Sequence, residues 1–306
     1  MKHYWSIENI NLKNTYVTIG TFDGVHKGHQ KILHNLTEEA KDSHSIPLVL
    51  TFFPHPAVVL GKREHPLYLT TPEEKAKLLG NNGAKIVITY PFTNFTAQKS
   101  ASDFVREIYP HLQMKCLIIG HDFALGHDRR GNAKKLEKLG EKYGFCVKVI
   151  QPYKINGVIV SSSVIRKHLT NGDVGLAALF LGRPYRIDGF VVEGDHRAQL
   201  LGTPTANLNT WDQRVHIKNG VYACKVIVDG QQMNAVTNIG VRPTFETDHS
   251  VPQIETHIIN FDKNLYGKNL QLDFIARIRD EIKFPTPLSL RKQIQMDIKK
   301  TLEILS

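Results

Sequence analysis

The sequence predicts an α/β N-terminal domain built on a parallel sheet, followed by a small antiparallel β-barrel with a terminal helix. Up to about residue 150, apolar strand-like runs alternate with helical patterns, the order that builds a parallel sheet covered by helices on both faces. After Arg183-Pro184, strand-like runs follow one another without helices between them, which favours a barrel. The domain boundary is therefore placed after residue 185, giving domains 1–185 and 186–306.

The N-terminal strands and helices are predicted from residue spacing and from helix-start signals. Thr71 is a helix N-cap candidate, with proline at the first helical position and glutamate at the third, and Ser100 opens another helix in the same way. Strands are expected at residues 16–20, 46–52, 85–90, 116–120 and 147–150. Further helices are expected at residues 29–41 and 133–143, where apolar residues recur at helical spacing.

The C-terminal part is rich in strand-like runs. Asp229-Gly230 between two such runs predicts a hairpin turn. Strands are expected at residues 185–192, 220–228, 233–239, 254–261 and 270–279. A helix is expected at residues 288–305.

Length and composition are those of a globular protein with two domains. The chain has 306 residues, 41% of them hydrophobic and 22% charged. No apolar run approaches the length of a membrane span, and the first residues lack the apolar core of a signal peptide, which favours the cytoplasm. Cys116, Cys146 and Cys224 are odd in number and lie in apolar segments, so buried thiols are expected rather than disulfides or a metal site.

The most informative segment is Thr21-Phe-Asp-Gly-Val-His-Lys-Gly-His29, between the first expected strand and helix. His26 and His29 are three residues apart, so both side chains lie on one face of the opening helical turn. A helix start offers backbone N–H groups and partial positive charge to a phosphate, and imidazoles can stabilise an oxyanion there. The alternative is a pair of surface histidines flanking a glycine.

Two familiar nucleotide-binding patterns are missing from the sequence. Neither the Gly-x-x-x-x-Gly-Lys-Ser/Thr loop nor the Gly-x-Gly-x-x-Gly fingerprint occurs. This favours chemistry at an α-phosphate through a different phosphate-binding turn. Gly20, Phe22 and Gly28 are assigned to phosphate binding with the two histidines.

Three more N-terminal segments carry candidate site residues. Phe53-Pro-His-Pro56 forms a rigid turn that presents His55, and the loop from Gly120 to Gly131 offers Asp122 as an acceptor. Ser161-Ser-Ser-Val-Ile-Arg166 opens a helix with Ser162 and Arg166 placed to bind phosphates. The alternatives are a plain turn, a solvated loop and an ordinary capped helix.

In the C-terminal domain the sharpest motif is Leu201-Gly-Thr-Pro-Thr-Ala-Asn207. Thr205 and Asn207 supply oxygen donors two residues apart, which suit Mg²⁺ and a phosphate tail, and the preceding residues 194–202, including Gly202, form a flap. Glu255 lies within an expected strand, where it is either a solvent-facing residue or a base facing the pocket. Arg242, in a nearby loop, is a further lining candidate.

The net charge of +10 also agrees with a nucleic-acid partner. Basic residues are scattered along the chain, however, and highly anionic small substrates such as ATP explain a positive surface equally well. We expect neither nucleic acid nor membrane as a partner.

Together these motifs resemble the bacterial bifunctional riboflavin kinase/FMN adenylyltransferase family, also called FAD synthetase. The resemblance covers essentially the whole chain in the same order. The motifs that carry it are Gly20-Thr-Phe-Asp-Gly-Val-His-Lys-Gly-His29, Pro54-His-Pro56, Gly120-His-Asp-Phe123, Ser161-Ser-Ser-Val-Ile-Arg166, Leu181-Gly-Arg-Pro-Tyr185, Pro204-Thr-Ala-Asn-Leu208, Gly220-Val-Tyr222, Asn238-Ile-Gly-Val-Arg-Pro-Thr244 and Glu255-Thr-His-Ile258.

The resemblance implies an N-terminal nucleotidyltransferase domain with a Rossmann-like sheet and a C-terminal kinase barrel. The barrel would phosphorylate riboflavin to FMN with Mg-ATP, and the N-terminal domain would transfer AMP from ATP to FMN, giving FAD and pyrophosphate. FMN and FAD would be substrate and product rather than redox cofactors. A homo-oligomer is left open.

The resemblance also implies residue roles. Glu255 would accept the hydroxyl proton of riboflavin. His26 and His29 would stabilise the α-phosphate during adenylyl transfer. The phosphate-binding residues would be Gly20, Phe22, Gly28, Ser162, Arg166, Gly202, Thr205 and Asn207, with Mg²⁺ on Thr205 and Asn207, and the flavin-binding residues would be His55, Asp122 and Arg242.

One segment departs from the family pattern. The kinase flap has His196, Ala198, Gln199 and Thr203 where glycines, an arginine and a phenylalanine are usual. Side chains there hinder close approach of the backbone to phosphate. The alternatives are therefore an adenylyltransferase with a weakened kinase domain, a flavin-nucleotide-binding regulatory protein, or an adenylyltransferase for another phosphate- or RNA-bearing substrate.

Overall fold

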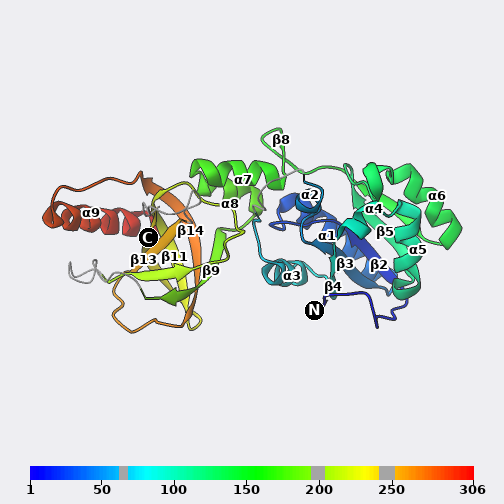
Figure 1. The fold of residues 1–306 in the computed structure, drawn as a ribbon, viewed down its shortest axis with the longest axis horizontal. Coiled ribbons are helices and arrows are strands. Elements are labelled where there is room, and N and C mark those ends of the chain that lie inside the picture. The colour runs from blue at the N-terminus through cyan, green and yellow to red at the C-terminus, as the bar shows by residue number, and fades with distance from the viewer. Residues whose placement is uncertain (62–67, 194–203, 241–251) are drawn as a thin grey trace. The chain divides into compact units, whose positions relative to one another are not determined.

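A computed structural model describes residues 1–61, 68–193, 204–240 and 252–306. Contacts divide the chain into two compact units, Met1–Ser162 and Ser163–Ser306. The boundary expected after residue 185 differs from this division by contacts, and it stays a prediction. The expected fold class, a parallel α/β sheet followed by an antiparallel barrel with a terminal helix, is confirmed (Figure 1).

The first unit is built on a six-stranded parallel sheet with the strand order β1-β4-β3-β2-β5-β6. Its strands are β1 (Lys2–Tyr4), β2 (Thr15–Ile19), β3 (Ile46–Phe53), β4 (Ile86–Pro91), β5 (Met114–Gly120) and β6 (Cys146–Ile150). A small hairpin follows, formed by β7 (Lys154–Ile155) and β8 (Val158–Ile159). All ladders of the large sheet are parallel, so the carboxyl ends of its strands share one edge.

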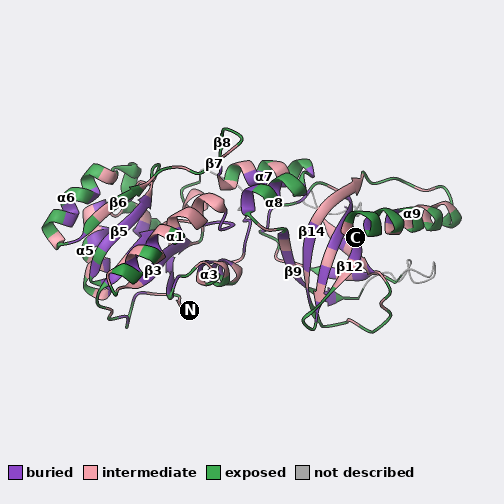
Figure 2. Ribbon diagram, turned by 180° about the vertical axis from the view of Figure 1, so that it is seen from behind, coloured by how far each residue is buried: buried purple, intermediate pink, exposed green. Residues whose placement is uncertain are grey.

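Helices cover both faces of this sheet, and the four central strands β2 to β5 are largely buried (Figure 2). The helices are α1 (Lys27–Asp42), α2 (Pro56–Val59), α3 (Pro72–Asn81), α4 (Asn94–Gln98), α5 (Ala101–Leu112), η1 (His127–Arg129) and α6 (Ala133–Tyr143). One core cluster joins the strands to α5 and α6, and the other joins them to α1 and α3. Two-sided burial explains why the strands are continuous apolar runs.

One expectation about the cysteines is wrong. Cys116 and Cys146 form a disulfide, with Cα atoms 4.4 Å apart, because β5 and β6 place the two residues directly opposite each other. This register could not be derived from the sequence, in which the two residues are 30 positions apart. Cys224 is a buried free thiol as expected, and burial raises its pKa.

The disulfide gives a simple chemical prediction. Denatured protein without reductant should show one reactive thiol, from Cys224, and three after reduction. Cys146→Ser should lower the free energy of unfolding by about 2–4 kcal/mol relative to oxidised wild type. Thiol titration and denaturant melts measure both, and three reactive thiols without reductant would contradict the bond.

The second unit is a closed barrel with the strand order β10-β13-β12-β11-β14-β9, all antiparallel. Its strands are β9 (Tyr185–Val192), β10 (Ala206–Asn209), β11 (Gly220–Val228), β12 (Gln231–Gly240), β13 (Gln253–Ile258) and β14 (Asn269–Arg279). Its helices are α7 (Ser162–Asn171), α8 (Val174–Leu181) and α9 (Pro287–Leu305). The short strand β10 was not expected, and β13 ends before the expected residue 261.

Two partly buried ion pairs join elements of the barrel unit. Arg186 of β9 donates two hydrogen bonds, of 2.7 and 2.6 Å, to the Asp273 carboxylate of β14. This bidentate geometry favours arginine. Arg279 at the end of β14 donates hydrogen bonds to both carboxylate oxygens of Asp297 in α9, and Gln293 also donates to Asp297. The Arg279–Asp297 contacts hold α9 against the barrel.

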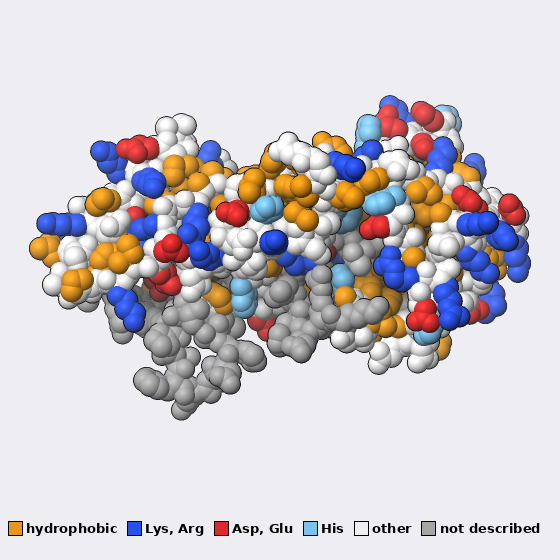
Figure 3. Space-filling view, turned by 90° about the horizontal axis from the view of Figure 1, so that it is seen from above, with side chains coloured by type: hydrophobic (Ala, Val, Ile, Leu, Met, Phe, Trp, Pro, Cys, Tyr) orange, Lys and Arg blue, Asp and Glu red, His pale blue; other side chains and the backbone are white. Residues whose placement is uncertain are grey.

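One face of the described residues has mixed charge. In the face drawn in Figure 3, lysine and arginine side chains are interspersed with aspartate and glutamate. Among the described residues, no helix combines the length and apolar composition that crossing a lipid bilayer requires.

Candidate functional sites

The Gly20–His29 segment forms a tight turn at the carboxyl edge of the sheet, between β2 and α1. Phe22, Gly24 and Val25 have positive φ angles of 48°, 80° and 40°, a conformation costly for Phe22 and Val25. A Cβ on Gly20 would lie 3.1 Å from the buried Phe22 ring, which explains why glycine occupies this position. Backbone strain of this kind persists where the surroundings fix the conformation, and it is common at functional sites.

Asp23 anchors the turn from inside. Its carboxylate, 2% exposed, accepts hydrogen bonds from the backbone N–H groups of Leu69 (3.0 Å) and Thr70 (3.3 Å) and from the Thr70 hydroxyl. The Thr70 hydroxyl in turn accepts from the N–H of Gly24. The buried carboxylate therefore holds the turn against the segment that leads into α3.

The two histidines stack at the N-terminus of α1. Their ring centroids are 3.6 Å apart with planes 16° from parallel. His26 is the N-cap, and its Nδ1 accepts the N–H of His29 at 3.3 Å, which leaves the proton of a neutral His26 on Nε2. Burial, and then the neighbouring charges of His26 and Lys75, hold the pKa of His29 well below its usual range.

The Nδ1 atom of the His29 ring stands out among the polar atoms of the turn. It is buried, and among the described residues no hydrogen-bond partner reaches it. His26 is 5% exposed, whereas His29 is partly exposed. The lowered pKa keeps His29 neutral at neutral pH.

The start of α7 passes beside this turn. A Cβ on Gly28 would lie 3.1 Å from the His26 ring and 3.4 Å from the Val160 carbonyl, so a side chain would crowd both. Ser162 donates its hydroxyl proton to the Asp23 carbonyl at 2.9 Å. The structure therefore brings Gly20, Phe22, His26, Gly28, His29 and Ser162 together, as the sequence indicated. Arg166 is buried in α7, four residues after Ser162 and so on the same helix face.

His55 and Asp122 follow the strands on either side of β2. His55 ends the loop after β3 and caps α2, accepting the N–H of Ala57 at 3.0 Å. Asp122 lies in the loop after β5, with an exposed side chain. Because β3, β2 and β5 are parallel neighbours, both residues lie at the same sheet edge as the histidines. Their roles in flavin binding stay predictions.

Sequence reasoning missed Lys75 in α3. It is 4% exposed, and its ammonium donates to the carbonyls of Thr21 (3.1 Å) and Phe52 (3.2 Å), beside the histidine turn. The buried positions of α3 are 72, 75, 76 and 79, a helical core stripe. A lysine within such a stripe is the signal that could have found it.

The second group of candidate residues lies on the outer face of the barrel. In β13 the residues alternate between buried and partly exposed, and Glu255 is on the partly exposed face. It pairs directly with Asn207 of β10 on one side and with Asn238 of β12 on the other. Side chains directly opposite on one face are neighbours, so the carboxylate lies between two amides.

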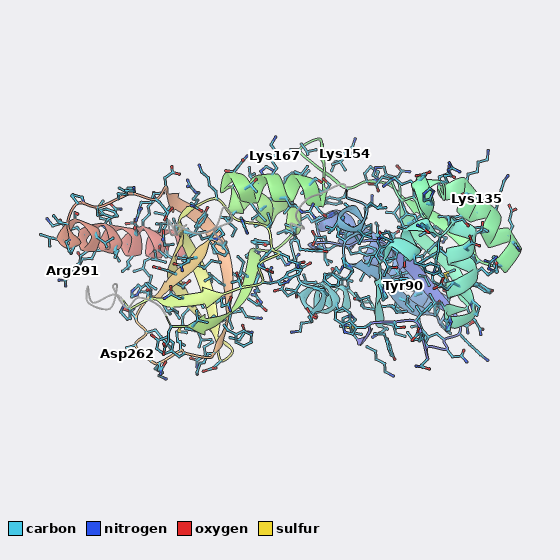
Figure 4. The ribbon with its side chains drawn as sticks, in the orientation of Figure 1. Tyr90, Lys135, Lys154, Lys167, Asp262 and Arg291 are labelled. Atoms are coloured by element: carbon cyan, nitrogen blue, oxygen red, sulfur yellow. A yellow bond between two sulfur atoms is a disulfide. The ribbon has the colours of Figure 1, made fainter. Side chains whose placement is uncertain are left out.

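A cavity of about 400 Å³ opens beside Asn207. Thr205, Asn207 and Thr256 line it together with the loop from Phe261 to Tyr266, which the sequence reasoning placed partly in a strand. Asp262 of this loop is labelled in Figure 4. The size of the cavity and its mixture of aromatic, hydroxyl, amide and charged groups suit a small polar ligand. The Nδ1 of His257 contacts the Pro204 carbonyl at 2.8 Å and so helps to position Thr205.

Several expected site residues lie outside the described part of the chain. These are Gly202, Arg242 and the four flap residues that differ from the family pattern, His196, Ala198, Gln199 and Thr203. Their assignments stay predictions.

Comparison with known proteins decides the family. Residues 8–164 match the family model described as FAD synthetase, and residues 181–305 match the one described as riboflavin kinase. The bifunctional riboflavin kinase/FMN adenylyltransferase of Haemophilus influenzae is 36% identical over 94% of this chain and 93% of its own length. The chain belongs to the bifunctional riboflavin kinase/FMN adenylyltransferase family. The family expected from the motifs is thereby confirmed.

Other comparisons agree over the full length. The protein of the same name from Bacillus subtilis is 35% identical over 95% of this chain and 92% of its own. A crystal structure described as a macrolide-efflux protein from Streptococcus pneumoniae superposes with a TM-score of 0.88, at 28% identity, over 98% of this chain and 97% of that one. Both enzymatic domains of the family are therefore present in the family's order.

Proposed function

We propose that this enzyme makes FMN and FAD at two separate sites, with adenylyl transfer at the histidine turn and riboflavin phosphorylation at the Asn207–Glu255 face of the barrel. The observation that carries the proposal is that two distinct groups of polar residues, one in each unit, match the two chemistries. The stacked histidines lie at a helix N-terminus suited to phosphate. The Glu255 carboxylate lies on the outer face of the barrel, opposite Asn207 of the neighbouring strand, and Asn207 also lines the cavity.

At the histidine turn, the enzyme's task is positioning and charge stabilisation. FMN already carries a phosphate nucleophile, so its attack on the α-phosphorus of ATP needs no strong base. His26, with its proton on Nε2, and the neutral His29 donate hydrogen bonds to the α-phosphate oxygens as charge develops. Ser162 binds the departing phosphates, His55 and Asp122 line the flavin and nucleotide pockets, and the phosphate-binding role of Arg166 stays a prediction.

At the barrel face, the riboflavin hydroxyl must lose a proton as it attacks the γ-phosphorus. Glu255 accepts that proton, and the adjacent Asn207 and Asn238 orient the carboxylate or the phosphates. Thr205 and Asn207 offer hydroxyl and amide oxygens at the cavity, and these donors fit Mg²⁺ when ATP phosphates complete its shell. When bound, the ion neutralises charge on the transferring phosphoryl group.

The substrates proposed are ATP, riboflavin and FMN, with the flavin nucleotides as substrate and product. The mixed charge on the face drawn in Figure 3 supports small anionic substrates rather than a nucleic-acid track. We place the enzyme in the cytoplasm, where riboflavin and ATP are available, and a homo-oligomer stays open.

A flavin turnover assay tests the function. Purified protein is incubated with riboflavin and Mg-ATP, and separately with FMN and Mg-ATP, and the three flavins are resolved. We expect FMN and then FAD in the first reaction and FAD in the second. If riboflavin persists while FMN becomes FAD, the barrel is inactive. The flap residues that differ from the family pattern would explain that result. Tight flavin binding without any turnover would instead indicate a regulatory protein.

A further inference from the structure

A buried lysine lies beneath the histidine turn. Lys75 occupies a core position of α3, and its side chain is almost fully excluded from solvent. Lysine is among the residues least often found fully buried, because its ammonium loses hydration there. A lysine kept in such a place is therefore expected to have a specific task.

The contacts of the ammonium define that task. It donates to the carbonyl of Thr21, in the turn just after β2, and to the carbonyl of Phe52, near the end of the neighbouring strand β3. The Thr21 carbonyl also accepts from the Thr51 hydroxyl at 2.9 Å. Lys75 thus joins the carboxyl ends of two central strands at the residue where the histidine turn begins.

The charge of Lys75 also acts on the turn. The charged or titratable groups that face it are Asp23 of the turn, His29 of α1 and His3 of β1. Burial lowers the pKa of Lys75 to about 8, with the Asp23 carboxylate opposing the shift, so the ammonium is mostly charged at pH 7. In a weakly polar interior this charge adds to the positive end of α1.

We propose that Lys75 is a positioning residue for adenylyl transfer, which holds the turn bearing His26 and His29 and adds positive charge behind it. The inference rests on the proposed function of the histidine turn. No group of the substrate needs to touch Lys75. Its effect is on how well the two imidazoles and the helix end meet the α-phosphate, where small displacements carry large rate penalties.

Three variants of the full-length enzyme test this role. Lys75→Met removes charge and hydrogen bonds, Lys75→Gln keeps a donor without the charge, and Lys75→Arg keeps the charge. Lys77→Met, on the exposed side of the same helix, is the matched control. We expect Lys75→Met to lower kcat for FAD formation about 10²-fold with little change in KM for FMN. FMN formation from riboflavin on the same chain, and FAD formation by Lys77→Met, should be unchanged.

The pH profile separates this role from a merely structural one. In wild type, FAD formation should fall above about pH 8, as Lys75 loses its proton. In Lys75→Arg this fall should disappear, because arginine stays protonated. In Lys75→Gln, loss of the positive charge should raise the pKa of His29, because Lys75 is one of the charges that lower it.

Several results would overturn the inference. One is normal FAD formation by folded Lys75→Met or Lys75→Gln. Another is an alkaline limb of the pH profile that is the same in wild type and in Lys75→Arg. If Lys75→Met does not fold, the Lys75→Gln and Lys75→Arg profiles decide. Failure of the proposed function is distinct, since it would appear as normal FAD formation by His29→Ala.

Discussion

Replacing Glu255 with glutamine is expected to lower the rate of FMN formation by about 10²–10⁴-fold, the usual loss when a general base is removed. Glutamine keeps the size of the side chain and its place between Asn207 and Asn238, but it cannot take the hydroxyl proton of riboflavin. FAD formation from supplied FMN should be unaffected, because it takes place in the other unit. Steady-state assays of the two reactions on one preparation measure both effects.

The matched control for this variant is Gln253→Ala, two residues earlier on the same face of β13. It perturbs the strand without removing the carboxylate, so both activities should persist. Glu255→Asp, which keeps a base but shortens its reach, should retain part of the kinase rate. Equal loss of both reactions in a folded Glu255→Gln protein, or an unchanged kinase rate, would refute the assignment of the base.

Much of the fold was predictable because its signals are local. Helix caps such as Thr71 and Ser100, and apolar strand runs such as the one ending at Ile19, are encoded within a few residues. Most of the elements that were missed are short, although the eight-residue helix α8 was missed too. Strand β1 has three residues and β10 has four, too few to show a pattern against neighbouring loops.

What the sequence could not supply depends on register between distant segments. The disulfide of Cys116 and the pairing of Glu255 with Asn207 each follow from which residues of two strands face each other. Strand spacing along the chain does not determine that pairing. The motif at His26 and His29 was recognisable because both residues lie in one turn, whereas its support from Lys75 comes from a helix more than 40 residues later.

Replacing His29 with alanine is expected to lower FAD formation by about 10²–10³-fold, the cost of losing one donor to a developing oxyanion. FMN formation should be retained. His34→Ala, an exposed histidine later in α1, is the control and should leave both reactions intact. If His29→Ala slowed both steps equally in a folded protein, or neither step, the adenylyl site would lie elsewhere.

His26 needs a different substitution, because it has two tasks. Its Nδ1 caps α1, and loss of an N-cap alone costs about 1 kcal/mol of stability, which would confuse an alanine variant. Asparagine is an equally good N-cap but has no imidazole. His26→Asn should therefore melt like wild type while FAD formation falls about 10²-fold or more. Wild-type FAD formation in this variant would mean that His26 serves only the helix, and that the stacked pair reduces to a single functional imidazole.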